Sequence, residues 1–296
     1  MIPEPVKRQI ELQLGDSLLY CEPICAGHVN RLYLIILNNK RYVLKLYAPL
    51  LPEEKILPSV KIQEYLAEKG ISPGVVFYSL NYPAFLLQEY ISPRDVWSFY
   101  LCGELLGKMH LYLSQYTGVL PKRHIPDSRV LSLPKDCLSE RQRELLKWKL
   151  LLCNKVEKLP ELDMQIIHGD YHSGNILGVE NAYYAVDFDE SKIYFRVYDV
   201  VKVIISLIRC MGFLRAYDGA RAFLSGYGTY IQLSVREIER MLDVYAYTLG
   251  RDTACLDEKH YCFSEEYLKE RIALHTFLFN EFDRIQGFIG RLILSL

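Results

Sequence analysis

The sequence predicts an α+β protein in which a small antiparallel sheet of five strands with one helix precedes a larger, mainly helical part. Segments rich in branched and aromatic side chains, which are typical of strands, gather before residue 91. Segments with helical periodicity dominate from residue 92 onward. We therefore expect a bilobal protein, with an N-lobe over residues 1–91 and a C-lobe over residues 92–296.

Turn residues separate the strand-like segments of the N-terminal part. The break at Asn38–Asn39–Lys40 predicts a hairpin between two neighbouring strands. Gly70, followed by Pro73, predicts the end of the single helix. The expected strands are 17–25, 31–38, 41–47, 74–79 and 84–90, and the expected helix is 53–69.

Helical patterns account for most of the C-terminal part. Residues 117–137 contain three prolines, so they are expected to form a connection without helices. No internal repeat or long linker interrupts the pattern. The expected helices are 95–116, 139–158, 197–214, 216–226, 234–249 and 264–294.

The composition restricts the class of protein. Half of the 296 residues are hydrophobic, which is enough for a sizeable buried core. A net charge of −1 argues against a nucleic-acid-binding protein, which would carry a strongly basic surface. The longest apolar stretch, 200–214, is interrupted by Lys202 and Arg209, so no membrane span is expected.

The eight cysteines are scattered and none forms a C-x-x-C pair. Cys21, Cys25 and His28 lie close in sequence, but no second ligand pair accompanies them, so a zinc site is not expected. Scattered free thiols fit the reducing cytosol. No apolar signal segment stands in the first residues, so a cytoplasmic location is expected.

The most informative segment is IIHGDYHSGNIL, residues 166–177. An apolar run leads into a loop that carries Asp170, and Asn175 follows five positions later. Twelve positions further, a second apolar run ends in Asp187–Phe188–Asp189. A kinase needs a carboxylate that orients and deprotonates a hydroxyl, an amide oxygen for Mg²⁺, and a carboxylate that links Mg²⁺ to the phosphates.

These residue types therefore predict catalytic roles for Asp170, Asn175 and Asp187. Asp170 is the expected base. Asn175 and Asp187 are the expected Mg²⁺ ligands, because Mg²⁺ prefers few, hard oxygen donors from protein.

The two segments resemble the aminoglycoside phosphotransferase and choline kinase-like family, whose catalytic loop reads H-G-D-x-H-x-x-N and whose metal loop reads D-F/W/Y-[DG]. The resemblance extends over nearly the whole chain. It implies a protein-kinase-like fold, ATP and Mg²⁺ as cofactors, and nucleotide binding by the N-lobe.

The resemblance also implies nucleotide-binding residues. Gly27 and Asn30 match a turn over the phosphates, although this turn has one glycine and departs from G-x-G-x-x-G. Lys45 matches the lysine for the α and β phosphates, and Glu64 its ion-pair partner. Residues 86–91 match the hinge that binds adenine, with contacts expected near Gln88, Glu89 and Tyr90.

Four further residues of the motifs have expected roles. His172 is expected either to contact a phosphate when protonated or to hydrogen-bond the loop. His168 is expected in the core. Asp189 is expected either to add to the metal site or to accept hydrogen bonds from nearby backbone, and a supporting role behind the metal ligands is favoured. Asp199 is expected to accept backbone N–H bonds that brace the catalytic loop.

The acceptor is expected to be a small molecule with a hydroxyl group, because no A-P-E segment for docking a peptide follows Asp187. The resemblance implies aminoglycosides or other antibiotics, amino alcohols, hydroxy amino acids or sugars, and the sequence does not choose among them. Four acidic residues are candidates for a cationic acceptor or, alternatively, belong to a solvated helix face: Glu265, Glu266, Glu281 and Asp283.

Two alternatives stay open at the level of sequence. One is a non-catalytic structural protein, such as a spore-coat-type protein that keeps this fold. The other is a protein Ser/Thr kinase, which shares the catalytic residues but has an activation segment. The oligomeric state is not predicted.

Overall fold

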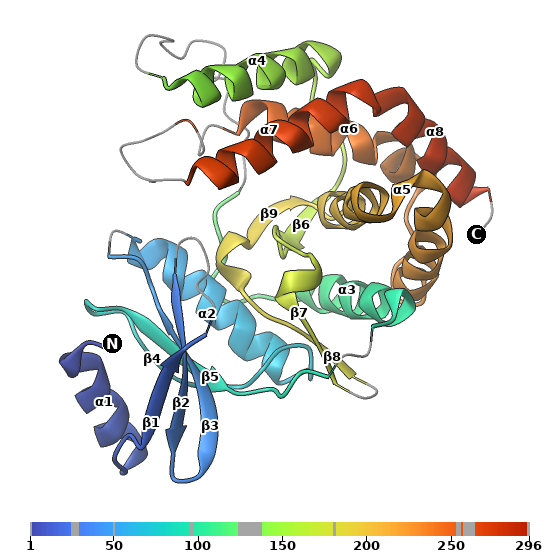
Figure 1. Cartoon of the computed structure of the whole chain (residues 1–296). Helices are drawn as coiled ribbons and strands as arrows, with labels where there is room; N and C mark the ends of the chain where they lie inside the picture. The colour runs from blue at the N-terminus through green and yellow to red at the C-terminus, as the bar shows by residue number, and fades with distance from the viewer. Residues whose placement is uncertain are drawn as a thin grey trace. The chain divides into compact units, whose positions relative to one another are not determined.

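The computed structural model describes residues 2–24, 30–49, 51–94, 97–123, 138–179, 182–252, 256 and 264–294. They form two compact units (Figure 1). The first comprises Met1–Lys122, Gln165–Ile193 and Phe223–Ile231, and the second comprises Arg123–Met164, Tyr194–Ala222 and Gln232–Leu296. The predicted lobe boundary at residue 91 stays a prediction.

The first unit contains an antiparallel sheet of five strands in the order β1-β2-β3-β5-β4, which confirms the predicted sheet. Asn38 and Asn39 connect β2 to β3, and both have positive φ angles, 48° and 58°. A two-residue hairpin loop needs positive φ at both positions, and Asn tolerates it. The strands are β1 (Tyr20–Pro23), β2 (Arg31–Leu37), β3 (Lys40–Leu46), β4 (Val75–Ser79) and β5 (Phe85–Glu89).

Helices cover both faces of this sheet (Figure 1). Helix α1 (Glu4–Leu14) was not expected from the sequence, and it buries Val6 and Ile10 against residues such as Leu44. Helix α2 (Glu53–Ala67) buries Ile56 and Val60 against the opposite face. Side chains alternate between the two faces along each strand, so β5 contributes Phe85 and Leu87 to the core on the α1 side and Leu86 to the core on the α2 side.

Two helical segments of the first unit approach each other unusually closely. A Cβ on Gly103 of helix α3 (Phe99–Leu113) would lie 1.9 Å from the Phe223 carbonyl oxygen. A Cβ on Gly226, near the end of helix α5 (Val197–Gly228), would lie 2.0 Å from the Tyr100 carbonyl oxygen. Only glycine fits at these positions, because any side chain would collide with backbone.

The second unit is helical. The predicted break between two helices near residue 215 occurs instead within α5 at Gly212, whose φ of 74° is not helical. The predicted helix over 264–294 is divided at Glu281, which has φ −100° and ψ 8°. The other helices are α4 (Glu140–Lys155), α6 (Val235–Arg251), α7 (Glu265–Asn280) and α8 (Phe282–Ile293).

Short elements between α4 and α5 carry the sequence motifs. Strand β7 (Ile176–Val179) pairs antiparallel with β8 (Ala182–Ala185). Strands β6 (Met164–Ile167) and β9 (Lys192–Phe195) lie before and after the motif loops in sequence. Among the helices of the described residues, none is long and apolar enough to cross a membrane.

Candidate active site

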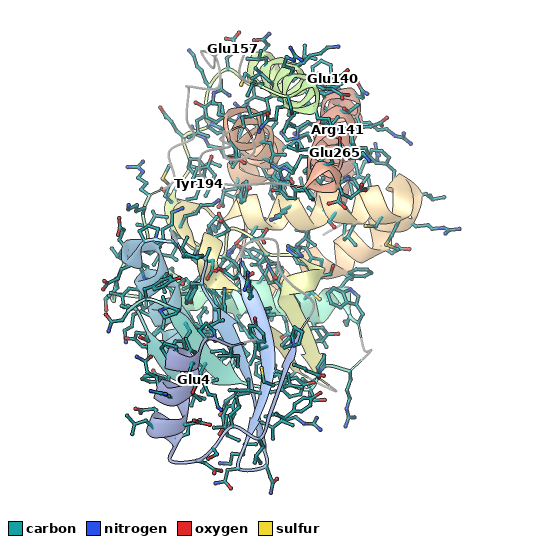
Figure 2. All side chains as sticks on the ribbon, turned by 60° about the vertical axis from the view of Figure 1, so that its left-hand side comes forward. Glu4, Glu140, Arg141, Glu157, Tyr194 and Glu265 are labelled. Atoms are coloured by element: carbon teal, nitrogen blue, oxygen red, sulfur yellow. The ribbon has the colours of Figure 1, made fainter. Side chains whose placement is uncertain are left out.

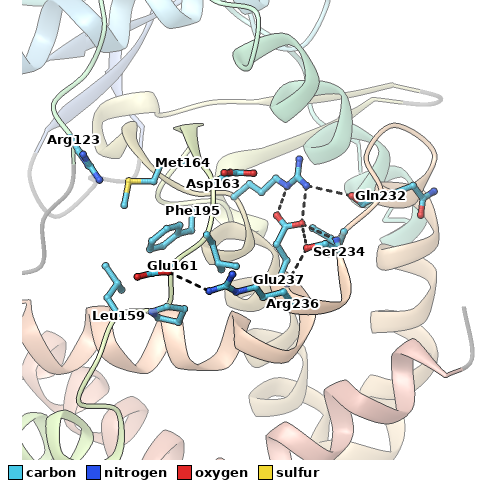
Figure 3. Close-up of a pocket in the computed structure, with 14 residues that line it drawn as sticks. Arg123, Leu159, Glu161, Asp163, Met164, Phe195, Gln232, Ser234, Arg236 and Glu237 are labelled. Atoms are coloured by element: carbon cyan, nitrogen blue, oxygen red, sulfur yellow. Dashed lines mark hydrogen bonds and ion pairs between the residues drawn. The ribbon is translucent and has the colours of Figure 1, made fainter.

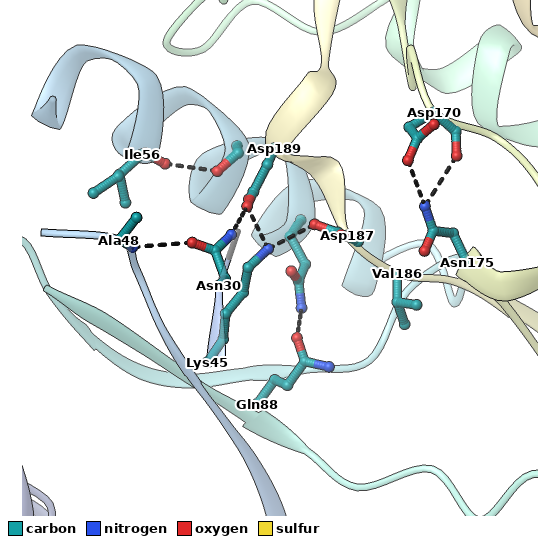
Figure 4. Close-up of polar contacts among 12 residues, drawn as sticks. Asn30, Lys45, Ala48, Ile56, Gln88, Asp170, Asn175, Val186, Asp187 and Asp189 are labelled. Carbon is teal, nitrogen blue, oxygen red and sulfur yellow. Dashed lines mark hydrogen bonds and ion pairs between the residues drawn. The ribbon is translucent and has the colours of Figure 1, made fainter. Parts of the chain in front are cut away.

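The Asn175 side chain hydrogen-bonds to Asp170, the expected base. Its Nδ2 donates to the Asp170 carbonyl oxygen at 3.0 Å and to the carboxylate Oδ2 at 3.2 Å (Figure 4). Because the amide nitrogen is used by Asp170, the amide oxygen is left for a cation. The Val186 N–H donates to the Asn175 carbonyl oxygen at 3.0 Å, which brings the metal loop beside the catalytic loop.

His168 connects the same two loops from the core, as expected. The Asp170 N–H donates to its Nδ1 at 3.2 Å, so Nδ1 is an acceptor and the proton of the neutral ring is on Nε2. Nε2 then donates to the Val186 carbonyl oxygen at 3.1 Å. The buried ring also packs against Phe188, with 4.9 Å between centroids.

Position 169 requires glycine for a structural reason that the sequence motif does not reveal. Its φ of 80° is left-handed, and a Cβ there would lie 2.1 Å from the Glu190 carbonyl oxygen. Backbone of the metal loop therefore occupies the space that a side chain would need.

His172 lies beside the base. Its Nδ1 accepts the Gly174 N–H at 3.0 Å, and its Nε2 lies 3.3 Å from Asp170 Oδ2. With Nδ1 used as an acceptor, the proton of the neutral ring is on Nε2 and faces the carboxylate. The structure thus places His172 against Asp170, which agrees with the loop alternative, and its phosphate contact stays a prediction.

Lys45 lies between two carboxylates of the metal loop. Its Nζ is 2.7 Å from Asp187 Oδ1 and 2.7 Å from Asp189 Oδ2 (Figure 4). Burial alone would lower the pKa of Lys45, but Asp189 and Asp187 outweigh it and raise that pKa above its usual value. Lys45 is therefore charged at neutral pH.

Asn30 joins the same cluster from the segment before β2. Its Nδ2 donates to Asp189 Oδ2 at 2.5 Å, and its Oδ1 accepts the Ala48 N–H at 3.1 Å. Both ends of the amide are therefore used (Figure 4). Gly27, the other residue expected in this turn, lies outside the described residues.

The expected ion pair between Lys45 and Glu64 is not formed among the described residues. Glu64 instead contacts Lys61 of its own helix, with 2.6 Å between Nζ and Oε2. Neighbouring residues in a helix point about 100° apart around its axis. Helix α2 buries the Gln63 side chain, so the next side chain, Glu64, points toward solvent and is 34% exposed. The expectation was wrong because sequence spacing does not define which side of the helix faces Lys45.

Several polar groups of the expected hinge residues already form hydrogen bonds within the protein. The Gln88 side chain is buried and accepts from Gln63 Nε2 at 2.8 Å. The N–H groups of Glu89 and Tyr90 donate to the carbonyl oxygens of Gly74 and Arg41 at 2.9 and 3.4 Å. The adenine contacts near these three residues stay predictions.

Asp187 has an unusual backbone for a residue other than glycine. Its φ of 66° and ψ of 71° are left-handed, a conformation that costs energy and recurs at functional sites. Its side chain is 47% exposed, so solvent or a ligand can reach the carboxylate.

The donor set fits Mg²⁺. The Asn175 amide oxygen and the Asp187 carboxylate are hard oxygen donors, and Mg²⁺ keeps waters and phosphate oxygens as its remaining ligands. Within the described residues, no group of three or more His, Cys, Asp or Glu side chains could hold a metal by itself.

The four acidic candidates for a cationic acceptor are paired within the second unit. Arg141 Nε lies 3.4 Å from Glu265 Oε1, and both residues project from neighbouring helices in Figure 2. The other three carboxylates have partners at 3.1 to 3.5 Å: Glu266 with Lys269, Glu281 with Arg284, and Asp283 with Lys155. These contacts favour the solvated helix face. Asp199 is fully buried at the start of α5, and its bracing role stays a prediction.

A separate cavity of about 760 Å³ lies within the second unit (Figure 3). Its wall contains two ion pairs, a bidentate one between Arg196 and Glu237 and a longer one between Arg236 and Glu161. None of the residues expected to bind nucleotide or metal lines this cavity.

Solved kinases share this fold. An amicoumacin kinase, in complex with AMP-PNP and Ca²⁺, is 19% identical with a TM-score of 0.66, and the match covers 95% of this chain and 96% of that one. A microcompartment-associated aminopropanol kinase is 14% identical with a TM-score of 0.65, over 96% and 99% of the two chains.

A choline kinase from Streptococcus pneumoniae is 16% identical with a TM-score of 0.64, over 94% of this chain and 98% of that one. No curated protein sequence matches the chain. The model of the phosphotransferase enzyme family matches residues 21–233, which include both motif loops and the lysine strand. By this match over most of its length, the chain belongs to the phosphotransferase enzyme family.

Proposed function

We propose that this protein is a small-molecule kinase that moves the γ-phosphoryl group of ATP to a hydroxyl group, with Mg²⁺ as cofactor. The observation that carries the proposal is the placement of Asp170, held by Asn175, beside a metal loop whose Asp187 contacts Lys45. Phosphoryl transfer needs positioning and charge neutralisation, and these groups supply both.

Nucleotide binding belongs to the first unit in this proposal. Lys45 is the point charge for the phosphates, and Asn30 lies at the turn that would cover them. The backbone near Gln88, Glu89 and Tyr90 is the proposed binding segment for adenine. Structural neighbours solved with AMP-PNP, ADP or AMP support this assignment.

Asn175 and Asp187 would hold the metal ion. Mg²⁺ supplies neutralisation of the charge on the phosphates when it is bound. Asp170 accepts the proton of the acceptor hydroxyl and orients its oxygen. Asn175 holds the Asp170 carboxylate, and the Asp170 N–H bond to His168 holds its backbone.

The acceptor is a small molecule in this proposal. The neighbours include kinases of an antibiotic, of aminopropanol and of choline, and the chain has no long segment after Asp187 for docking a peptide. Antibiotics and amino alcohols are therefore the first acceptors to screen, followed by hydroxy amino acids and sugars. The scattered cysteines support a cytoplasmic location.

The test measures thermal stabilisation by Mg·ATP and then ADP release with each class of acceptor. Stabilisation by Mg·ATP together with ADP release that depends on one acceptor supports the proposal and identifies the substrate class. A folded protein that neither Mg·ATP nor Mg·ADP stabilises contradicts it and favours a non-catalytic member of the family. Phosphate transfer to a protein substrate, with none to small molecules, contradicts the acceptor class.

A further inference from the structure

We propose that Asp189, held in place by Asn30, is the carboxylate that anchors Lys45, in the position that a helix carboxylate was expected to fill. The inference rests on the proposed function, because Lys45 matters as the lysine that binds the nucleotide phosphates. It makes Asp189 and Asn30 positioning residues that act through Lys45.

Among the described residues, Lys45 forms its ion pairs with Asp187 and Asp189, and none with a carboxylate of helix α2. Lys45 near the end of β3 and Tyr47 just after that strand lie on the same side of the sheet, because side chains alternate along an extended backbone. The ring centroid of Tyr47 lies 5.4 Å from Lys45 Nζ, and the ring packs with Ile56 and Val60 of α2. Ser59 of the same helix donates to the Ile56 carbonyl oxygen at 2.8 Å. The α2 side chains that pack with Tyr47 are therefore apolar, and the Ser59 hydroxyl forms its hydrogen bond within the helix itself.

Asp189 is bound from two directions through one oxygen. Its Oδ2 lies 2.7 Å from Lys45 Nζ and 2.5 Å from Asn30 Nδ2. Asn30 cannot turn away without losing the Ala48 N–H, which its Oδ1 accepts at 3.1 Å. Segments far apart in sequence, before β2, after β3 and after β8, are thus joined at this carboxylate (Figure 4).

The two carboxylates at Lys45 differ in exposure. The Asp187 side chain is 47% exposed and the Asp189 side chain 19%. Asp187 is the proposed metal ligand, so Asp189 is the partner that stays with Lys45 when a nucleotide is bound. A buried ammonium needs such a partner, because an unpaired charge in the interior is strongly unfavourable.

The test is a double-mutant cycle on the affinity for Mg·ADP, measured by calorimetry. The variants are Asp189→Asn, Lys45→Ala and the two combined, and Glu190→Gln is the matched control. Glu190 is an exposed carboxylate one residue away, so its variant removes the same charge from the same loop. Circular dichroism confirms that each variant is folded.

We expect Asp189→Asn to weaken Mg·ADP binding about 10-fold in the natural background and less than about 2-fold when Lys45 is already alanine, as for charges in direct contact. Glu190→Gln should change the affinity less than about 2-fold in either background. Asn30→Ala keeps every charge and should show the same dependence on Lys45, so the proposal stays testable if Asp189→Asn does not fold.

If Asp189→Asn weakens Mg·ADP binding equally in both backgrounds, Asp189 acts independently of Lys45. This result would overturn the inference but leave the proposed function standing. A coupling of Glu64→Gln to Lys45→Ala, with none for Asp189→Asn, would also overturn it and restore the helix carboxylate. If Lys45→Ala itself binds Mg·ADP normally, the nucleotide site of the proposed function is wrong, and the inference falls with it.

Discussion

Asn175 and Asp170 form a two-point contact, in which one amide nitrogen donates to both the backbone carbonyl oxygen and the carboxylate of the same residue. This arrangement leaves the second carboxylate oxygen, Oδ1, outside the contact with Asn175 and directs the Asn175 amide oxygen elsewhere. One residue pair thus orients the expected base and presents a donor for the expected cation.

Asp170→Asn should reduce turnover about 10²- to 10⁴-fold, the usual range for loss of a general base. The variant is isosteric, so nucleotide affinity should change less than about 2-fold. Steady-state kinetics with calorimetry on Mg·ADP measures both. Unchanged turnover would remove Asp170 from the mechanism, and a matching loss of affinity would point to a structural role.

Asp187→Ala should abolish the part of ATP binding that depends on Mg²⁺. The structure gives Asp187 a half-exposed carboxylate on a left-handed backbone, which alanine cannot reproduce as a ligand. Thermal stabilisation by ATP, measured with Mg²⁺ and with a chelator, should become the same in the variant. A retained difference between the two conditions would show that other groups hold the ion.

The catalytic and metal loops could be predicted from sequence because their contacts are local or join neighbouring segments. Asp170 and Asn175 are five residues apart, and Val186 follows a strand that pairs with the strand after Asn175. The Asn30 contact with Asp189 spans 159 residues, and no local pattern indicates which long-range partner an asparagine will find.

Two other features could not be predicted from the sequence, for physical reasons. Helix α1 has only Val6 and Ile10 buried among eleven residues, too few apolar positions for a clear helical period. The partner of Lys45 depends on how helix α2 is rotated, and that rotation follows from packing of Ile56 and Val60 rather than from the spacing to Glu64.

Gly103→Ala should destabilise the protein by about 1–3 kcal/mol, the range for overpacked interiors. The added methyl would lie 1.9 Å from the Phe223 carbonyl oxygen, so two helical segments must separate. Gly290→Ala in α8 is the control, because a Cβ there meets nothing within 4 Å. Urea unfolding should show the control at least as stable as the parent, since alanine favours helix. Equal stability of both variants would contradict the close packing.

The bond between Arg196 and Glu237 should make stability depend on pH. Arg196 Nε and Nη2 lie 2.7 and 2.9 Å from the two carboxylate oxygens, and the Ser234 N–H also donates to Glu237 at 2.9 Å. Burial would raise the pKa of Glu237, but the bonds from Arg196 and Ser234 outweigh it and hold the pKa below its usual value.

A carboxylate whose pKa is lower in the folded state stabilises the fold above its unfolded pKa, about 4.3 for Glu, and loses this contribution as the pH falls through the folded value. Glu237→Gln should therefore cost about 1.5–3 kcal/mol at pH 7, the range for a hydrogen bond to a charged group, and progressively less below pH about 4. Glu239 is an exposed carboxylate on the same helix. The stability difference between Glu239→Gln and the parent should therefore not depend on pH in this way. Thermal unfolding from pH 3 to pH 7 measures the difference, and a cost that is constant over this range would show that the ionised form of Glu237 does not stabilise the fold.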